Sequence, residues 1–497
     1  MSGSRITQTE LEAYLWGAAV LLRGLIDAGD YKGYIFPLVF LKRISDVWDE
    51  ERASALEMYA GDETLAALPE NHRFTIPEGA HWDQVRATTS NVGRKLISAM
   101  RAIESANPDT LNGVFGDGEW TNKNLMPDAT LTGLVEHLST QTLSLVNLPE
   151  DELGNGYEYL IKRFADDSGH TAQEFYTNRT LVHLMARMLD AQPGESVYDP
   201  TCGTGGMLIS TAAELKNQGK EHRTLKLYGQ ERNFTTAAIS KMNLFLHGIE
   251  DGHIAHGDTL AAPDFLDSHG RLRTFDVVLA NPPYSIKAWD REGFAADPYG
   301  RNMWGVPPQG RADYAFFQHV AASMDAKTGR AAILFPHGVL FRQEEKVMRE
   351  NLVKSGLLEC VLGLGAGLFY NSPMEAVVVV LRTGRLADQR DKVLFINAID
   401  LVARERAQSF LRPAHQEAIL KAFEGFADVD GLAAVASREA IAKNDYSLAI
   451  PLYVSEEVRA STKASLEDAF VAWRSAAQNV DLAVDGLLDA LTAEVRL

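Results

Sequence analysis

The feature that most constrains the fold of this chain is a series of short β-branched runs, separated by intervals long enough to hold a helix. Six runs are expected to form strands: 196–198, 224–228, 275–280, 331–335, 359–362 and 376–381. Strands that alternate with helix-length intervals predict an α/β fold, in which a mostly parallel sheet carries helices on both faces. Ligands bind such sheets beyond the carboxyl ends of the strands. The residues that follow these runs are therefore the first candidates for chemistry.

The sequence on either side of these runs has patterns typical of helices, and no strand pattern precedes residue 195. Near the start, apolar residues recur at alternating intervals of four and three, which places them on one helix face: Leu11, Leu15, Ala18, Leu22 and Leu25. Near the end, the same intervals form a heptad seam: Leu466, Phe470, Trp473, Ala477, Val480, Val484, Leu487 and Leu491. We therefore expect a helical N-terminal domain over 1–165, an α/β domain over 166–455 and a C-terminal helix over 456–497.

Composition narrows the function classes. The 497 residues include 48 basic and 67 acidic side chains, and the formal charge of −19 opposes unassisted binding to a phosphate backbone. A content of 46% hydrophobic and 23% charged residues is that of an ordinary globular protein rather than a disordered one. Two cysteines, Cys202 and Cys360, predict a reducing compartment. No apolar run approaches the roughly 20 residues that cross a bilayer, and no His/Cys cluster has metal-ligand spacing. We expect a cytoplasmic protein with no metal site and no membrane partner.

A glycine-rich loop follows the first expected strand. Asp199 ends that strand, and Gly203, Gly205 and Gly206 then allow the backbone to turn tightly and approach a ligand. No Gly-Lys-Ser/Thr follows, so the loop is not a P-loop, and the final glycine of a dinucleotide fingerprint is missing. Asp199 is placed to accept a hydrogen bond from an amine, which favours a ligand with a charged amino group. On this motif alone, a glycine turn without a ligand remains an equal alternative.

Two further carboxylates follow neighbouring strand regions. Glu231 ends the second strand, where an acid can accept hydrogen bonds from two ribose hydroxyls. Asp258 follows the third strand region and could reach an adenine. Alone, each would more often be a helix cap or a solvated surface residue. Together with Asp199 they predict a pocket for a nucleoside that bears an amino acid, S-adenosylmethionine.

The sequence Asn281-Pro282-Pro283-Tyr284 follows the apolar run 275–280. The two prolines remove donors, so this loop presents carbonyl groups. The Asn281 side chain and the Pro282 main chain could accept the hydrogens of an exocyclic amine and free its lone pair for in-line attack on a sulfonium methyl. Tyr284 would stack on a base removed from its helix. A proline turn that merely caps the strand is the competing interpretation.

The segment 285–310 is a candidate substrate flap, because it follows this loop and is rich in glycine and proline. Its basic and aromatic side chains are candidates for DNA contact: Lys287, Arg291, Tyr299, Arg301 and Trp304. A surface loop with its aromatic side chains packed inward is the alternative for any one of these residues.

These motifs resemble those of the modification (methyltransferase) subunits of type I restriction-modification systems. The similar segments span nearly the whole chain: 15–46, 153–160, 174–179, 230–233, 241–248, 257–260, 281–284, 311–319 and 444–448. The resemblance implies a Rossmann-like class I S-adenosylmethionine-dependent methyltransferase domain, with a helical N-terminal domain and a C-terminal helical tail. It implies methylation of adenine N6 in double-stranded DNA, on an adenine flipped from the helix.

The same resemblance implies a set of cofactor contacts. They are Glu174, Phe175, Tyr176, Thr177, Asn178, Arg179, Gly203, Thr204, Gly205, Gly206, Glu231 and Asp258. The family usually has proline after Phe-Tyr-Thr, where this chain has Asn178. We expect this difference to alter the stiffness of the loop and not to prevent cofactor binding.

Partners are implied in the same way. The family works with a DNA specificity subunit, with two methylase copies per copy of it, and with an optional motor-nuclease subunit in defence against phage. The C-terminal heptads fit a helix that docks on such a partner, although a tail folded on its own domain has comparable weight. Three other functions remain open: a stand-alone adenine DNA methyltransferase, a protein-glutamine methyltransferase and a non-catalytic assembly scaffold.

Overall fold

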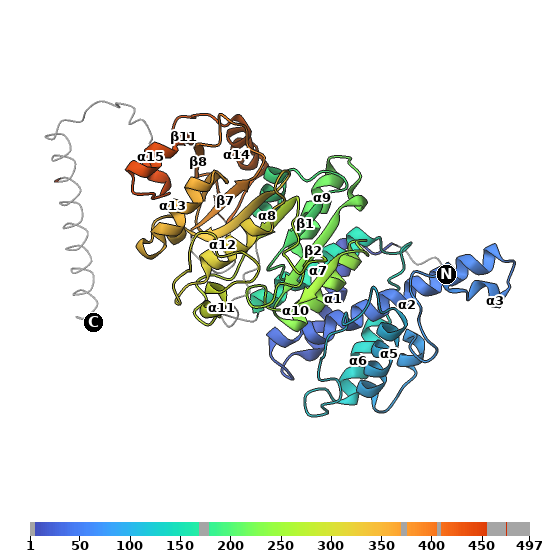
Figure 1. Ribbon diagram of the computed structural model, residues 1–497. Coiled ribbons are helices and arrows are strands. Elements are labelled where there is room, and N and C mark those ends of the chain that lie inside the picture. Colours follow the sequence, from blue (N-terminus) through green and yellow to red (C-terminus); the bar gives the residue numbers. More distant parts are fainter. Residues whose placement is uncertain (1–4, 168–177, 369–374, 405–408, 455–473, 475–497) are drawn as a thin grey trace, which may run out of the picture. The chain divides into compact units, whose positions relative to one another are not determined.

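The computed structural model describes residues 5–167, 178–368, 375–404, 409–454 and 474 (Figure 1). Residues 1–454 form one compact unit, and residues 455–497 form a second. The expected C-terminal helix with its heptad seam falls almost entirely outside the described residues. The same is true of the expected cofactor contacts Glu174, Phe175, Tyr176 and Thr177.

Helices make up the first part of the compact unit: α1 (Gln8–Leu22), α2 (Lys32–Met58), α3 (Glu63–Ala66), α4 (Trp82–Arg86), α5 (Val92–Ala106), α6 (Asp128–Leu138) and α7 (Glu150–Asp167). Thr7 and Glu10 form a capping box that begins α1. The predicted apolar face is buried as far as Leu22. Leu25 lies beyond the helix and is exposed, because the chain turns at Gly24, where φ is +81°. The prediction was therefore wrong only for this last residue.

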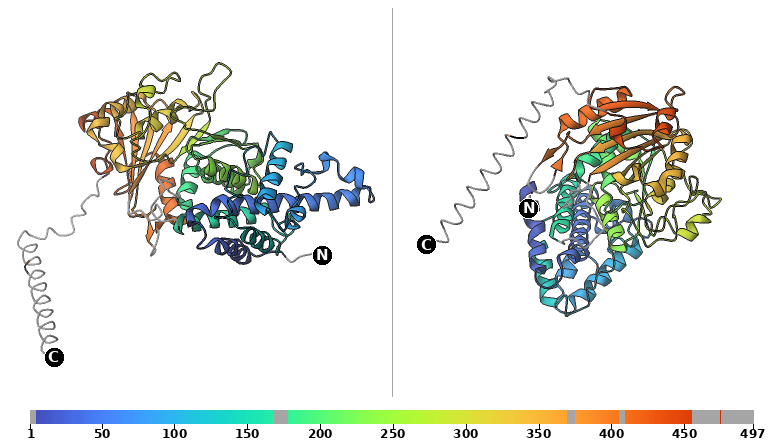
Figure 2. Two further views of the ribbon diagram at one scale, coloured as in Figure 1. Left: turned by 90° about the horizontal axis from the view of Figure 1, so that it is seen from below. Right: turned by 90° about the vertical axis from the view of Figure 1, so that its left-hand side faces the viewer.

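The helical region shares a hydrophobic core with helix α10 (Phe234–Leu246) of the α/β region. Ile239, Met242 and Leu246 of α10 belong to the same buried cluster as the N-terminal helices. Phe40 of α2 meets Phe245 edge-on, with the ring centroids 5.2 Å apart. Figures 1 and 2 both show the helical region, in blue to teal, against the green α10. This shared core places the N-terminal helices beside the sheet.

The sheet has nine strands: β1 (Ser196–Asp199), β2 (Lys226–Glu231), β3 (His253–His256), β4 (Val277–Ala280), β5 (Arg330–Pro336), β6 (Leu358–Leu364), β7 (Ala376–Arg382), β8 (Lys392–Ala398) and β11 (Ala433–Ser437). Their order is β11-β8-β6-β7-β5-β4-β1-β2-β3. The half β3-β2-β1-β4-β5 is parallel, as predicted. Strand β7 is antiparallel to both of its neighbours, and the six predicted runs did not include β3, β8 and β11. The described residues also contain a small ribbon of β9 (Ala403–Arg404) and β10 (Ser409–Phe410).

Helices cover both faces of this sheet: α8 (Arg179–Leu189), α9 (Gly206–Asn217), α10, α12 (Asp313–Ala322), α13 (Lys346–Ser355), α14 (Pro413–Gly425) and α15 (Arg438–Lys443). The short helix α11 (Arg291–Ala295) lies apart from the sheet, in segment 285–310. Alternate strand residues point to opposite faces. Val197 of β1 lies in a buried cluster with α8, α9 and α14, and its neighbour Tyr198 lies in a cluster with α12 and α13. This burial on both faces explains why the strands are continuous apolar runs. Among the described residues, none of the helices is long and apolar enough to cross a membrane.

Candidate active site

The carboxyl ends of β1, β2 and β4 open onto one cavity of about 1510 Å³. Strand order reverses here, because β1 lies between β2 and β4. The cavity lining contains most of the residues predicted from the strand ends: Gly203, Thr204, Glu231, Asp258, Asn281, Pro282 and Pro283. The structure therefore brings the glycine loop, the two acids and the Asn-Pro-Pro segment together at one place.

The glycine loop adopts a conformation that explains its composition. Gly203 and Gly205 have φ values of +54° and +82°, in the left-handed region that side chains disfavour. A Cβ on Gly205 would also lie 2.8 Å from Ser240 Oγ. Gly205 caps helix α9, so the strand leads through the loop into a helix, as predicted. The Gly203 N–H donates to Glu231 Oε2 at 3.1 Å, which ties the loop to the end of β2.

Glu231 and Asp258 are oriented by backbone donors. Glu231 Oε1 accepts from the Asn233 N–H at 2.7 Å, in addition to its bond from Gly203. Asp258 Oδ1 accepts from the N–H of Leu260 at 3.0 Å. Each carboxylate oxygen has two lone pairs, so these bonds orient the side chains and leave capacity for hydroxyl or amine donors. This geometry suits the predicted contacts with ribose and adenine.

Asp199 ends β1 directly before the glycine loop and is 1% exposed, and it is not among the described residues that line the cavity. Its Oδ1 accepts from the Thr201 N–H at 3.0 Å. Burial raises its pKa to about 7, and the negative charge of Glu231 adds to this effect. A nearby cation would therefore stabilise the ionised form of this carboxyl group. Burial also raises the pKa of Cys202 well above its ordinary value, which agrees with a packing role for this thiol.

The Asn281–Tyr284 loop is held by an internal hydrogen bond. The Tyr284 hydroxyl donates to Asn281 Oδ1 at 2.7 Å, which determines the orientation of the asparagine amide. Burial raises the pKa of Tyr284 well above its ordinary value, so the phenol keeps its proton and remains a donor. The asparagine oxygen has a second lone pair for an incoming amine.

Asn178 and Arg179 are engaged by the protein itself. Asn178 caps α8, since its Oδ1 accepts from the Thr180 N–H at 2.9 Å, and its amide donates to the Ser409 carbonyl at 2.8 Å. Arg179 forms an ion pair with Glu158 of α7. Neither residue is among the described residues that line the cavity. Asparagine at 178 thus fastens the start of α8 to the β9–β10 ribbon.

Two of the residues predicted to contact DNA are in the interior. Arg301 is 2% exposed, pairs with Asp297 at 2.6 Å and donates to the Leu260 carbonyl at 2.8 Å. Trp304 is 4% exposed and meets Phe317 edge-on. As DNA contacts these two predictions were wrong, because both side chains fasten segment 285–310 to the protein. The segment also contains α11, so it is a folded element rather than a bare flap.

The other three candidates on this segment retain access to solvent. Lys287 is exposed, and Arg291 and Tyr299 are partly exposed. Arg291 also donates to the Pro307 carbonyl at 2.8 Å, which holds the two arms of the segment together.

Replacing Arg301 with Met is expected to lower the free energy of unfolding by about 3–5 kcal/mol, because it leaves the buried Asp297 without its charged partner. The matched surface variant Lys287→Ala should unfold like the parent, and it should reduce the salt dependence of DNA binding by about one phosphate contact. Urea denaturation of both variants tests the first expectation, and binding titrations across salt concentrations test the second. An Arg301 variant as stable as the parent would refute the assigned role.

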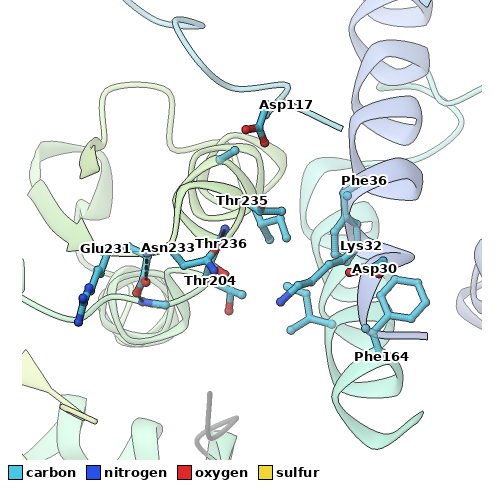
Figure 3. A pocket seen from close by; sticks show the side chains of 18 of the residues that line it. Asp30, Lys32, Phe36, Asp117, Phe164, Thr204, Glu231, Asn233, Thr235 and Thr236 are labelled. Carbon is cyan, nitrogen blue, oxygen red and sulfur yellow. Dashed lines mark hydrogen bonds between the residues drawn. The ribbon is translucent and has the colours of Figure 1, made fainter. Parts of the chain in front are cut away.

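The far wall of the cavity comes from the N-terminal helices and was not predicted. Figure 3 shows Lys32, Phe36 and Phe164 facing the cavity across from Thr204 and Glu231. No local motif marks these residues, since only the packing of α2 and α7 against α10 brings them there.

The geometry defines a class of enzyme. Gly203 and Thr204 of the loop between β1 and α9, an acid at the end of β2 and the Asn281–Pro283 segment after β4 line one cavity, as in an S-adenosylmethionine-dependent methyltransferase that acts on a conjugated amine. The chain belongs to the N-6 DNA methylase family, and within it to the methylase subunits of type I restriction-modification systems. The family model for N-6 DNA methylase matches residues 149–461, and the model for the HsdM N-terminal domain matches residues 11–138.

Individual relatives agree with this assignment. The type I restriction enzyme MjaIX methylase subunit of Methanocaldococcus jannaschii is 28% identical over 481 residues, which cover 90% of this chain and 84% of the relative. The MpnII methylase subunit of Mycoplasma pneumoniae is 27% identical over 90% of this chain and 89% of its own. A solved type I methyltransferase subunit from Streptococcus thermophilus is 30% identical, with a TM-score of 0.78 over 90% of this chain and 100% of that one.

Proposed function

We propose that this chain transfers a methyl group from S-adenosylmethionine to the N6 amino group of adenine in double-stranded DNA, at a sequence selected by a separate specificity subunit. The observation that carries the proposal is that the Asn281–Pro283 segment lines the same cavity as Gly203, Thr204 and Glu231. Family membership supports the same reaction.

The residues present fit the cofactor. Asp199 offers a buried carboxyl group whose raised pKa favours a cationic neighbour. Glu231 offers an oriented acid for two hydroxyls, and Gly203, where a Cβ would meet nothing within 4 Å, leaves the backbone open at the cavity wall. When bound, S-adenosylmethionine supplies an activated methyl group on a sulfonium.

The chain's own groups prepare the amine. Asn281 Oδ1, oriented by the Tyr284 hydroxyl, accepts one amine hydrogen, and the Pro282 carbonyl accepts the other. These two bonds draw the hydrogens out of the base plane and restore the nitrogen lone pair. The contribution of the loop is positioning and electrostatic, and its acceptors are fixed before the substrate arrives.

The substrate is a base taken out of its helix. A cavity of about 1510 Å³ exceeds the roughly 300–1,000 Å³ of a pocket for one small ligand. It therefore has room for a flipped adenine beside the cofactor, with Tyr284 as the stacking face. Lys287, Arg291 and Tyr299 are the proposed DNA contacts of segment 285–310.

The formal charge of −19 explains why we assign target selection to another subunit. Two methylase copies per specificity subunit are proposed, with a motor-nuclease subunit as an optional member, and the assembly would act in the cytoplasm on phage and host DNA.

The test combines calorimetric cofactor binding with tritiated methyl transfer, using this chain alone and with its specificity subunit. We expect the chain alone to bind cofactor, and transfer to adenine to require the second subunit. Transfer by the chain alone would identify a stand-alone methyltransferase, and transfer to a protein glutamine would identify the amide-directed alternative. A chain that binds no cofactor would be a scaffold.

Removal of the residues after 460 is expected to weaken assembly with the specificity subunit and to leave the fold of the remaining chain intact. The reason is the heptad seam of this segment, which fits a docking helix. Size-exclusion chromatography with light scattering measures the mass of the complex, and circular dichroism checks the fold. An unchanged complex would show that the segment does not dock.

A further inference from the structure

The catalytic loop ends at a residue with an unusual backbone. Ser285, directly after Tyr284, has a φ of +52°, which a residue with a side chain rarely adopts. Its N–H donates to Asp313 Oδ1 at 2.7 Å. Asp313 opens α12, lies outside the cavity lining and has a side chain that is 0% exposed. A buried carboxylate thus holds the end of the loop in its strained conformation.

The second oxygen of this carboxylate is also committed. Asp313 Oδ2 accepts from Arg342 at 2.7 Å, and Arg342 also approaches Glu345 at 3.5 Å. An acidic side chain in the first turn of a helix ordinarily lies in solvent and stabilises the helix by interacting with its dipole. Here the carboxylate instead joins two segments, the catalytic loop and the chain that follows β5.

A further set of contacts supports Arg342. Arg349, which is buried in α13, donates to the Arg342 carbonyl at 2.6 Å and to the Tyr446 carbonyl at 3.2 Å. The Leu448 N–H donates to the Leu340 carbonyl at 2.8 Å. The segment 444–448 is one of the segments that resemble the family, and the sequence indicated no role for it. In the structure its backbone contacts support the residues around Arg342.

We propose that Asp313 is a positioning residue for methyl transfer. It holds Ser285, and through it Asn281 and Tyr284, in the geometry that receives the target amine, while Arg342 holds Asp313. This inference rests on the methyl transfer proposed above. A displacement of about 1 Å at a reacting group can lower a rate about 10²-fold.

Asp313→Asn tests this role with little change in volume. The amide oxygen forms its stronger bond with the charged Arg342, so the amide nitrogen turns toward the Ser285 N–H and the loop loses its acceptor. With the specificity subunit present, we expect kcat to fall about 10²-fold, while the dissociation constant of the cofactor stays within about twofold of the parent value. In the isolated chain, hydrogen–deuterium exchange of residues 281–288 should become faster.

Glu195→Gln is the matched control. Glu195 pairs with the buried Arg330 at 2.7 Å at the opposite, amino ends of β1 and β5. This variant also weakens a largely buried ion pair, but it should leave kcat and exchange at 281–288 unchanged. The positioning role would be overturned if kcat fell in both variants, Asp313→Asn and Glu195→Gln, in the same proportion to the fall in melting temperature.

A second substitution provides a rescue. Glycine adopts left-handed conformations without steric cost, so Ser285→Gly in the Asp313→Asn background should recover about tenfold of the lost kcat. The proposal is overturned if Asp313→Asn alone leaves both kcat and the exchange of 281–288 at the parent values. If the parent complex transfers no methyl group, the proposed function fails, and the exchange comparison still decides whether Asp313 holds the loop.

Discussion

Replacing Asn281 with Ala is expected to reduce methyl transfer by about 10³-fold, with the affinity for S-adenosylmethionine within about twofold of the parent value. The substitution removes the side-chain acceptor that Tyr284 orients and leaves the Pro282 carbonyl as the only acceptor of the pair. The proposed cofactor contacts lie on other strand ends, at Gly203 and Glu231, and keep their mutual hydrogen bond. The measurement is the initial rate of tritiated methyl incorporation into unmodified DNA, with binding measured by calorimetry.

Tyr284→Phe is the control that separates the acceptor from its orientation. The variant keeps an aromatic face for stacking and loses only the hydroxyl that donates to Asn281. We expect an intermediate loss of rate, about fivefold, because a hydrogen bond of this kind contributes about 1 kcal/mol. Methyl transfer that survives intact in Asn281→Ala would show that the asparagine carbonyl is not the acceptor.

The sequence predicts those residues of the site that lie at the carboxyl ends of strands. The runs before Asp199, Glu231 and Asn281 all lie in strands of the parallel half of the sheet. In a parallel sheet the carboxyl ends of neighbouring strands lie at the same edge. Local motifs that directly follow such strands are therefore brought together by topology, without any long-range information.

Residues whose roles depend on tertiary packing could not be predicted in this way. Arg301 has an acid four residues earlier, which is a signal for an ion pair, but its burial depends on the approach of the Asp258–Leu260 turn. Lys32 reaches the cavity only because the N-terminal helices share a core with α10. The valine run of β7 likewise predicts a buried strand but does not specify its direction, which is antiparallel to both neighbours.

The second large effect is expected at Asp199, because the burial of its carboxyl group both suits it to a cationic cofactor and lowers the stability of the fold at neutral pH and above. Burial raises its pKa to about 7 in the folded chain, from an ordinary value of 3.8. Between these values the folded state holds a proton that the unfolded state has released, so the contribution of Asp199 to stability falls as pH rises from about 4 to 7. Above pH 7 the group is ionised and its burial opposes folding.

Asp199→Asn should therefore raise the melting temperature of the cofactor-free chain at pH 8, with a much smaller difference at pH 5, and should weaken cofactor binding by about 10²-fold. An amide cannot pair with the cofactor's amino cation, whereas the parent carboxylate can once it has lost its proton. In the parent, affinity should accordingly increase as pH rises toward 7, with a proton released on binding, and the variant should lack both effects. Thermal unfolding at the two pH values and calorimetry in buffers of different ionisation enthalpy measure these quantities. A variant that binds cofactor like the parent would show that the amino group does not pair with Asp199, whereas a variant less stable than the parent at pH 8 would show that the ionised carboxylate is already paired within the fold.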